Sequence, residues 1–292
     1  MSICDQRCII ITGAGGGLGR AYALAFAAEG AQVVINDIRP DAAASVAAEV
    51  IAAGGQAIAN SGDITSMAGA KAIVDAALAA FGEVHVLVNN AGILRDRMFL
   101  SLSEEDWDAV MRVHLKGHFC LANVLGRRWR DAKKAGTPVD HPRIINTSSG
   151  AGLQGSIGQS NYVAAKAGIA GLTLVQAAEL ARYGITVNCL APAARTTMTE
   201  GAMPEMVKKP DSGFDVWDPL NVASIVVWLG SPLSADVTGR CFEAKGGELS
   251  IGDGWRTGHI VDHGARWNPA DLGPVVARLI ANGVPPQKVY GT

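Results

Sequence analysis

The stretch CIIITGAGGGLG, residues 8–19, decides the fold of this chain. It opens with an apolar run, which is typical of a strand that is buried on both faces. The glycines that follow allow a tight turn close to a pyrophosphate, and a helix N-terminus just beyond them favours the anion. A glycine run between a first strand and a first helix predicts a dinucleotide-binding turn, with a purely structural turn as the alternative. The predicted contacts are Gly13, Gly15, Gly16, Gly17, Leu18 and Gly19.

The same alternation of short apolar runs and longer Ala-rich helical stretches continues along the chain. The predicted strands are Cys8–Thr12, Gln32–Asn36, Gln56–Asn60, Val84–Val88, Arg143–Thr147, Thr186–Leu190 and Cys241–Ala244. The predicted helices span residues 18–29, 41–53, 67–81, 104–129, 160–182 and 218–230. This order implies βαβ units, and therefore an α/β fold with a doubly wound parallel sheet.

No linker or repeat divides the chain, so we expect one domain over residues 1–292. A Rossmann-type core would cover about 7–250 and a C-terminal helical extension about 251–292. In that extension Asn268-Pro269 precedes apolar residues at helical spacing, which predicts a helix with Asn as its cap and Pro at its first position. This helix would cover the core or a neighbouring subunit.

Composition excludes several classes of protein. Hydrophobic residues make up 49% of the 292 residues and charged residues 18%, which rules out a disordered chain. The net charge of −2 gives no electrostatic footprint for nucleic acid or for an anionic membrane. The five cysteines are odd in number and widely spaced, so we expect free thiols and a reducing, cytoplasmic location. Met1–Arg7 gives no sign of a secretion signal, and no apolar run reaches the length of a membrane span.

An acidic residue at the end of the second predicted strand bears on the choice of cofactor. Asp37 lies 24 residues after Gly13, where a carboxylate can accept hydrogen bonds from the adenosine ribose and would repel a 2′-phosphate. We therefore predict NAD rather than NADP, although the nearby Arg39 could accommodate the phosphate. Asp63, with Ile64, follows the third strand and is a candidate for the adenine side, with helix capping as the alternative for Asp63.

Tyr162 and Lys166 are four residues apart, so on a helix they share one face. The ordinary pKa of a tyrosine is about 10, which is too high for an efficient base near neutrality, and a nearby cation would lower it. Ser149 closes the fifth predicted strand and can polarise a carbonyl across the cleft. All three residues fall at the carboxyl edge of the predicted sheet, where ligands bind in this architecture.

These motifs, together with Asn89–Gly92, resemble the motif set of the short-chain dehydrogenase/reductase family over residues 8 to about 250. The resemblance implies hydride transfer between a nicotinamide cofactor and a secondary alcohol or ketone. It implies that Tyr162 is the acid/base, that Lys166 holds the nicotinamide ribose, and that Ser149 orients the substrate oxygen. Further cofactor contacts are implied at Asn90, Ala91, Gly92, Pro192, Arg195 and Thr197. The family's usual Pro-Gly is Pro192-Ala193 here, which leaves the register of the threonines Thr196 and Thr197 open.

A narrower resemblance links residues 85–200 to the (3R)-hydroxyacyl-CoA dehydrogenase module of multifunctional enzyme type 2 and its bacterial single-domain relatives. It rests on NNAGILRDR at 89–97, RVHLKG at 112–117 and GQSNY at 158–162. His114 stands where many family members have a catalytic Asn, and it either serves the lysine-linked proton relay or is a structural histidine. Arg95 and Arg97 would bind the phosphates of a CoA ester, or else form surface ion pairs. This chain lacks the module's Gly-rich extension after the second strand.

Other functions stay open at this point. A 3-oxoacyl reductase and a steroid or polyol dehydrogenase would use the same residues, and a non-catalytic dinucleotide-binding regulator would not need them. The partners we expect are a small-molecule substrate and a second copy of the chain, because the family usually forms dimers or tetramers through helices that could include Trp107 to Trp129. No metal is expected, since the pairs His114/His118 and His259/His263 have no third ligand at motif spacing.

Overall fold

The computed structural model describes residues 2–292 apart from 203, 253, 255 and 286. A single sheet runs through its centre in the strand order β3-β2-β1-β4-β5-β6-β7-β8. All neighbouring strands are parallel except β8, which is antiparallel to β7. The strands are β1 (Cys8–Thr12), β2 (Gln32–Asn36), β3 (Gln56–Asn60), β4 (Val86–Asn89), β5 (Arg143–Thr147), β6 (Thr186–Pro192), β7 (Cys241–Lys245) and β8 (Glu248–Gly252).

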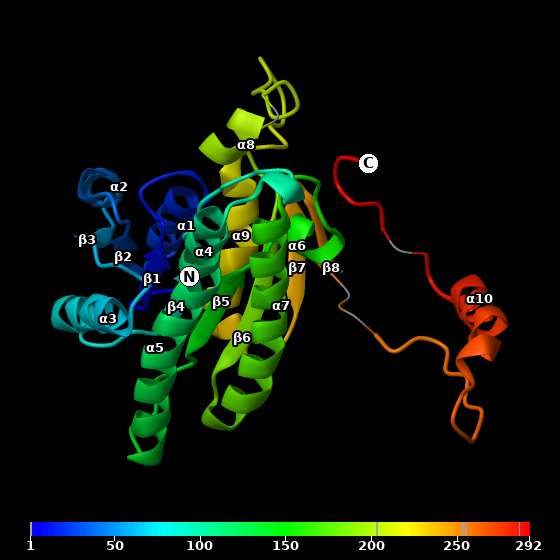
Figure 1. Cartoon of the computed structure of the whole chain (residues 1–292). Helices are drawn as coiled ribbons and strands as arrows, with labels where there is room; N and C mark the ends of the chain where they lie inside the picture. Colours follow the sequence, from blue (N-terminus) through cyan, green and yellow to red (C-terminus); the bar gives the residue numbers. More distant parts are fainter. Residues whose placement is uncertain (1, 203, 253, 255, 286) are drawn as a thin grey trace.

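Helices cover both faces of this sheet (Figure 1). The α-helices are α1 (Gly17–Ala28), α2 (Pro40–Ala52), α3 (Met67–Phe81), α4 (Glu104–Met111), α5 (Gly117–Lys134), α6 (Gly150–Gln154), α7 (Ser160–Leu180), α8 (Thr197–Ala202), α9 (Pro219–Gly230) and α10 (Leu272–Asn282). The shorter elements are the 3₁₀ turns η1 (Phe99–Ser101), η3 (Ala181–Tyr183), η4 (Pro232–Ser234) and η5 (Pro269–Asp271), and the π-helix η2 (Arg112–Lys116).

Two apolar layers form the core. One packs α1, α2 and α9 against the sheet, and Phe26 and Val226 are among its buried side chains. The other packs α3 and α5 against the opposite face, and Trp129 lies within it. The strand order reverses between β1 and β4, which opens a crevice at the carboxyl ends of these strands. The predicted α/β fold with a doubly wound, mainly parallel sheet is confirmed.

Helix caps follow the side chains that the sequence places there. Ser66 accepts a hydrogen bond from the Gly69 N–H at the start of α3, and Ser103 accepts one from the Asp106 N–H at the start of α4. Each satisfies a backbone donor that would otherwise have no partner in the first turn. These caps fix where both helices begin.

Several elements differ from the sequence-based prediction. The long helix expected over 104–129 is divided into α4, η2 and α5, because the backbone widens to a π-helix around His114. β8 was not predicted, since its side chains are mostly exposed and lack the apolar run of the other strands. The short helices α6 and α8 were also missed.

The C-terminal extension does not cover the core of its own chain. The chain leaves the body after β8, forms η5 and α10, and then returns (Figure 1). The Asn268-Pro269 pair begins η5, and α10 itself begins three residues later at Leu272. No described side chain of α10 is buried. The alternative of core coverage is therefore wrong for this helix.

One helical stretch, Ser160–Tyr183, is long and apolar enough to cross a membrane by length and composition alone. It comprises α7 and η3, and α7 packs against β5 and β6 in this fold. The same helix carries Tyr162 and the buried Lys166 on the face that packs against the sheet, while Leu174 and Val175 are exposed.

Candidate active site

The glycine turn leaves a cradle at the end of β1. A Cβ atom on Gly19 would lie 2.4 Å from the Gly13 carbonyl oxygen, and one on Gly13 would lie 2.7 Å from the Ala91 Cα. A Cβ on Gly16 would meet nothing within 4 Å, so this glycine borders open space. Gly16 is the N-cap of α1 and gives no side-chain cap to the helix. The first N–H groups of α1 therefore face a space that an anion can fill.

The strand β4 is held to this turn by Asn90. Its side-chain amide donates to the Thr12 carbonyl at 2.9 Å and to the Gly13 carbonyl at 3.3 Å. The Thr12 hydroxyl in turn accepts the backbone N–H groups of Asn90 and Ala91. The amide of Asn90 thus holds the end of β4 against the glycine turn, and Ala91 packs against Gly13.

Asp37 closes the cradle on the β2 side. Only 6% of this residue is exposed, and its carboxylate accepts the Gly15 N–H at 3.0 Å. It also accepts the Arg39 backbone N–H and side-chain Nε, at 3.0 and 3.1 Å. Burial opposes the ionised carboxylate, but the hydrogen bonds from Arg39 and Gly15 outweigh it and keep the pKa of Asp37 below its ordinary value. The carboxylate is therefore negative at neutral pH, and Arg39 is paired with it.

The two predicted contacts after β3 play different parts. The Asp63 carboxylate accepts the Thr65 N–H and hydroxyl, at 2.8 and 2.9 Å, in the turn before α3. The Ile64 side chain is buried and lies against Gly117 of α5. The side chain of Ile64 is therefore directed into the core and not toward the glycine turn.

The segment after β6 lies on the other side of the glycine turn. Pro192 ends β6 beside Ala244 of β7. The side chain of Arg195 stabilises the loop itself, because its guanidinium forms an ion pair with Asp215 and donates to the Val207 carbonyl. The threonine that reaches the turn is Thr196, which would be 3.5 Å from a Cβ on Gly17, whereas Thr197 is exposed at the start of α8.

The structure brings Ser149, Tyr162 and Lys166 together at the carboxyl edge of the sheet. Lys166 is 3% exposed, and its Nζ donates to the Thr147 carbonyl at 2.7 Å. The same Nζ lies 5.5 Å from the centroid of the Tyr162 ring. The Ser149 side chain is close enough to hydrogen-bond the phenol of Tyr162 and to lower its pKa. A hydroxyl, a phenol and an ammonium thus converge where a substrate oxygen can bind.

The acid–base balance of this trio differs from the sequence-based expectation. Burial raises the pKa of Tyr162 above its ordinary value, the Ser149 hydrogen bond opposes this, and the nearby Asp96 carboxylate adds to it. Lys166 is not among the causes of this shift, so the expected lowering by its charge is not seen. Burial lowers the pKa of Lys166 itself to about 8. Desolvation by burial is therefore the largest cause of the pKa shifts of both Tyr162 and Lys166.

His114 lies against the phenol, in the π-helix η2. Its ring meets the Tyr162 ring edge-on with centroids 5.3 Å apart, and its Nε2 contacts the Ile93 backbone O and N at 2.8 and 3.0 Å. Burial and the charge of Lys166 lower the pKa of His114 to about 3. The imidazole is therefore neutral at physiological pH. A Cβ on Gly92 would lie 2.3 Å from its Cε1, so this ring also supports the cofactor loop.

Sequence reasoning missed His118, one turn further along α5. This histidine is buried, and its Nε2 accepts the Thr147 N–H at 3.3 Å. The carbonyl of the same Thr147 holds Lys166. His118 therefore fixes the backbone segment on which the ammonium is anchored. The only sign of His118 in the sequence is its four-residue spacing from His114, and from the sequence this spacing is considered only for metal binding.

The two histidine pairs have other uses. His114 and His118 bind backbone groups of Ile93 and Thr147, and His263 stacks on Trp267. Within the described part of the chain, no group of three or more His, Cys, Asp or Glu side chains is arranged to hold a metal ion.

Comparison with known proteins identifies the family. The family model described as short chain dehydrogenase matches residues 7–208, which is more than half of the chain and includes the glycine turn and all three catalytic candidates. The chain is a short-chain dehydrogenase. The family resemblance inferred from its motifs is confirmed, and the chain is an oxidoreductase of this class.

Individual relatives agree with this assignment. The chain is 40% identical to hydroxyacyl-CoA dehydrogenase ChsB1 of Mycobacterium tuberculosis, over 97% of its own length and 91% of the relative. It is 43% identical to mouse peroxisomal multifunctional enzyme type 2, covering 86% of this dehydrogenase but only 32% of that enzyme. A solved short chain dehydrogenase from Mycobacterium avium superposes with a TM-score of 0.91 at 52% identity, covering 99% of this chain and 100% of the other.

Proposed function

We propose that this dehydrogenase oxidises (3R)-hydroxyacyl-CoA esters with NAD. The observation that carries the proposal is the convergence of Ser149, Tyr162 and Lys166 beside an open anion cradle on β1. The relatives named for hydroxyacyl-CoA chemistry and for multifunctional enzyme type 2 support the substrate class. The closeness of Asp37 to the glycine turn supports NAD.

The residues present fit a dinucleotide. The uncapped start of α1 and the open space beside Gly16 suit a pyrophosphate. The buried carboxylate of Asp37 suits the two ribose hydroxyls, and Lys166 suits the second ribose near the phenol. When bound there, the nicotinamide ring supplies the hydride acceptor.

The chain's own residues then handle the proton and the orientation. Ser149 donates to the substrate oxygen and holds it beside Tyr162. The phenolate of Tyr162 takes the hydroxyl proton from the substrate. Lys166, whose ammonium lies 5.5 Å from the ring centroid, offers the phenolate a positive charge, although burial and not this charge dominates the pKa of the phenol in this structure. His114 and Gly92 exclude water from this end of the site, since the imidazole fills the space that a side chain on Gly92 would need.

The mouth of the site suits a long acyl thioester. The three residues Met98, Phe99 and Leu100 are 62%, 70% and 96% exposed, which gives an apolar surface next to Arg97. The backbone of Arg97 is fixed to the loop before Tyr162 by its N–H bond to the Gly158 carbonyl, at 2.8 Å. Apolar surface beside a basic group matches an acyl chain beside the phosphates of CoA.

A panel of alcohols tests the proposed substrate. We expect (3R)-hydroxyacyl-CoA esters to give a higher kcat/KM with NAD than free hydroxy acids, steroids or simple secondary alcohols. Arg97→Ala should raise KM for the CoA esters by about threefold, the scale of an exposed ion pair, and leave KM for small alcohols unaffected. Steady-state absorbance of NADH measures both.

Arg95→Ala is the matched control for that variant. The guanidinium of Arg95 is engaged with Asp106, with Nε 3.5 Å from Oδ1, so its removal should change KM for CoA esters less than the removal of Arg97. CoA esters that are inert while a steroid or a simple alcohol turns over would contradict the proposed substrate class. The family assignment would stand in that case.

Cofactor choice gives a second prediction. We expect the wild type to prefer NAD, and Asp37→Ser to shift the NAD/NADP ratio of kcat/KM by about 10- to 100-fold toward NADP, because like-charge contacts at a binding site are costly. The variant also releases Arg39 for the 2′-phosphate. Arg39→Ala is the control, and in the Asp37→Ser background it should reverse part of the shift. Faster turnover of the wild type with NADP at equal low concentrations would show that Arg39 dominates.

Other activities use the same residues. Reduction of a 3-oxoacyl thioester is the reverse reaction, and a relative named 3-oxoacyl-[acyl-carrier-protein] reductase is 38% identical over 85% of this chain. A steroid or polyol dehydrogenase is distinguished by the substrate panel. A non-catalytic regulator is disfavoured, because a binding protein has no use for the buried trio.

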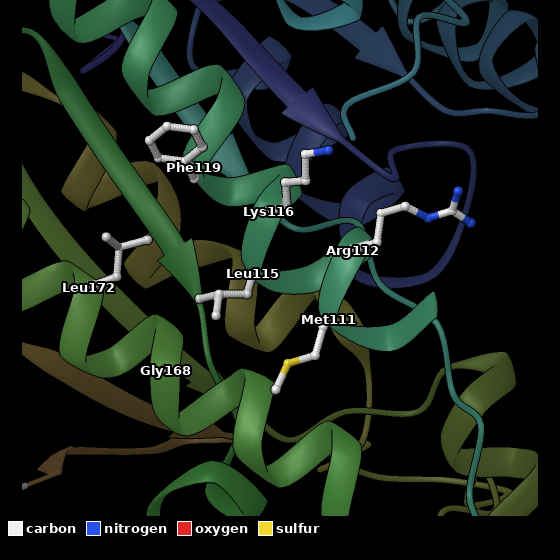
Figure 2. A pocket seen from close by; sticks show the side chains of 7 residues that line it. All are labelled: Met111, Arg112, Leu115, Lys116, Phe119, Gly168 and Leu172. Carbon is white, nitrogen blue, oxygen red and sulfur yellow. The ribbon is translucent and has the colours of Figure 1, made fainter. Parts of the chain in front are cut away.

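A second copy of the chain is the proposed partner. Exposed apolar side chains lie on α5 and α7, where Phe119, Leu174 and Val175 are 45%, 56% and 53% exposed. Figure 2 shows an apolar hollow between α7 on one side and the end of α4, η2 and the start of α5 on the other. Its lining residues are Met111, Arg112, Leu115, Lys116, Phe119, Gly168 and Leu172. Covering this face in a homodimer or homotetramer would remove it from water. Trp129 takes no part, because it is buried inside its own protomer. Light scattering of the purified protein tests the assembly.

The cytoplasm is the proposed location, supported by free thiols at Cys4, Cys8, Cys120, Cys189 and Cys241. We also propose that residues 1–292 act as one catalytic domain. The support is that residues of the extension return to the loop beside Ser149, where Tyr290 forms a β-bridge with Ser156.

A further inference from the structure

The last residues of the chain lie on the loop that joins two catalytic residues. This C-terminal tail, Val289–Thr292, pairs with the end of α6 and the turn that follows it. The Tyr290 N–H donates to the Gly155 carbonyl at 3.1 Å, and the Ile157 N–H donates to the Tyr290 carbonyl at 2.9 Å. These bonds form a parallel bridge between Ser156 and Tyr290. The tail is thus fixed to the segment that leads from Ser149 to Tyr162.

Side chains fit this pairing closely. A Cβ on Gly150 would lie 2.7 Å from the Tyr290 hydroxyl oxygen, so this phenol occupies the space next to Gly150. A Cβ on Gly155 would lie 3.3 Å from both methyl groups of Val289. Gly150 directly follows Ser149 in the chain, so Tyr290 packs against the residue next to the one whose hydroxyl is proposed to orient the substrate oxygen.

The extension is clamped at both of its ends. A Cβ on Gly252, where β8 ends, would lie 2.9 Å from Cδ1 of Leu153 in α6. The tail meets the same short helix and its following turn. The excursion that includes α10 leaves the body after β8 (Figure 1), and its last residues are hydrogen-bonded to the turn that follows α6.

The tail leaves an accessible apolar surface beside the site. Tyr290 is 50% exposed, Val289 is 38% exposed and Ile157 is 47% exposed. We propose that this surface is one wall of the substrate site and that Tyr290 is a specificity-determining residue, which limits the bulk allowed next to the reacting carbon. This inference goes beyond the proposed substrate class, because it holds for whichever secondary alcohol the enzyme oxidises.

Hydrogen exchange tests whether the tail docks in solution. The wild type is compared with a variant that lacks residues 289–292, and exchange is followed in the peptide that contains Gly155–Ile157. We expect faster exchange in the truncated enzyme, because the Ile157 N–H loses its acceptor. Equal exchange in the two proteins would overturn the inference.

Selectivity tests the role of Tyr290. Two pairs of substrates differ in bulk near the reacting carbon: (3R)-hydroxy-2-methylbutanoyl-CoA against (3R)-hydroxybutanoyl-CoA, and a hydroxysteroid against 2-butanol. For the pair that the wild type oxidises, Tyr290→Ala should raise the bulky-to-small ratio of kcat/KM by about tenfold, the scale of a small change in pocket volume. The truncated enzyme should show a similar ratio.

A double-mutant cycle separates this role from general damage to the fold. Gly150→Ala places a methyl group against the Tyr290 hydroxyl, so it should move the tail and change the ratio in the wild-type background. In the Tyr290→Ala background the same substitution should have less effect on the ratio. Gly171→Ala is the matched control, because a Cβ on Gly171 meets nothing within 4 Å and should leave the ratio unchanged.

The outcomes distinguish this inference from the proposed function. An unchanged ratio in both Tyr290→Ala and the truncated enzyme would overturn it, as would additive effects of Gly150→Ala and Tyr290→Ala. If CoA esters are inert but Tyr290→Ala raises the bulky-to-small ratio of kcat/KM for the steroid pair, the proposed substrate class is contradicted and the proposed role of Tyr290 is supported.

Discussion

Tyr162→Phe is expected to lower kcat by about 100- to 10,000-fold, the range measured for lost acid–base catalysis. In the proposed mechanism the phenol oxygen takes the substrate proton, and phenylalanine keeps the ring that packs edge-on against His114. Folding and NAD binding should therefore change little. Circular dichroism, quenching of protein fluorescence by NADH and single-turnover kinetics measure the three properties.

The pH dependence of the wild type belongs to the same prediction. Burial raises the pKa of Tyr162, so in the free enzyme the active phenolate becomes more abundant as the pH rises, and kcat/KM for oxidation should increase with pH. The residual activity of Tyr162→Phe should lack this rise. Turnover of Tyr162→Phe within a few-fold of the wild type would remove Tyr162 from the mechanism.

Lys166→Met has the second largest expected effect, a loss in kcat/KM on the order of 100-fold or more. Methionine matches the length of the buried stem but has no ammonium to stabilise the phenolate of Tyr162. The variant should also raise the KM for NAD, because Lys166 is the proposed contact of the nicotinamide ribose. A change in substrate KM alone, with kcat and the KM for NAD retained, would contradict this role.

Stability should respond to the same substitution in a pH-dependent way. The folded pKa of Lys166, about 8, lies below the ordinary lysine value of 10.5, so between these values the unfolded chain binds more protons than the folded one. Stability gained from this group therefore rises with pH across that window. The difference in unfolding free energy between wild type and Lys166→Met should move in favour of the wild type from pH 8 to pH 10. Urea denaturation at several pH values measures it.

The motifs that we propose contact the cofactor and the substrate oxygen could be predicted from the sequence, because each is local. The glycines after β1 are close in the chain, and Tyr162 and Lys166 are one helical turn apart. Ser149 needed only the rule that carboxyl ends of parallel strands share an edge. The apolar runs likewise predicted the seven parallel strands, since a parallel strand that is covered on both faces is apolar along its length.

The contacts that hold those residues in place could not be predicted from the sequence in the same way. His118 acts through the Thr147 backbone, which is 29 positions away, and no residue pattern records a bond from a ring nitrogen to a main-chain N–H. The widening of the helix at His114 replaces one regular hydrogen-bond spacing by another, with the same residues on either side. The split of the helix expected over 104–129 therefore appeared only in three dimensions.

The pKa values of Tyr162 and Lys166 also depend partly on residue spacing and partly on tertiary packing. The sequence placed a cation next to Tyr162, and the expected consequence was a lowered pKa. The tertiary structure instead buries both groups, so desolvation dominates and the pKa of Lys166 falls to about 8. Proximity follows from the spacing of residues, whereas the loss of water depends on everything that packs around them.

By itself the sequence determined the α/β architecture, the glycine turn and the proposed catalytic trio, because apolar periodicity and short-range spacing specify which side chains share a face. Only the tertiary structure decided that Asp37 is bound by Gly15 and Arg39, that His118 anchors the lysine segment, and that Tyr290 returns to Gly150. Each of these contacts joins residues through backbone groups or through an exposed segment. Such contacts carry no apolar pattern, so their partners are chosen by how the whole chain packs.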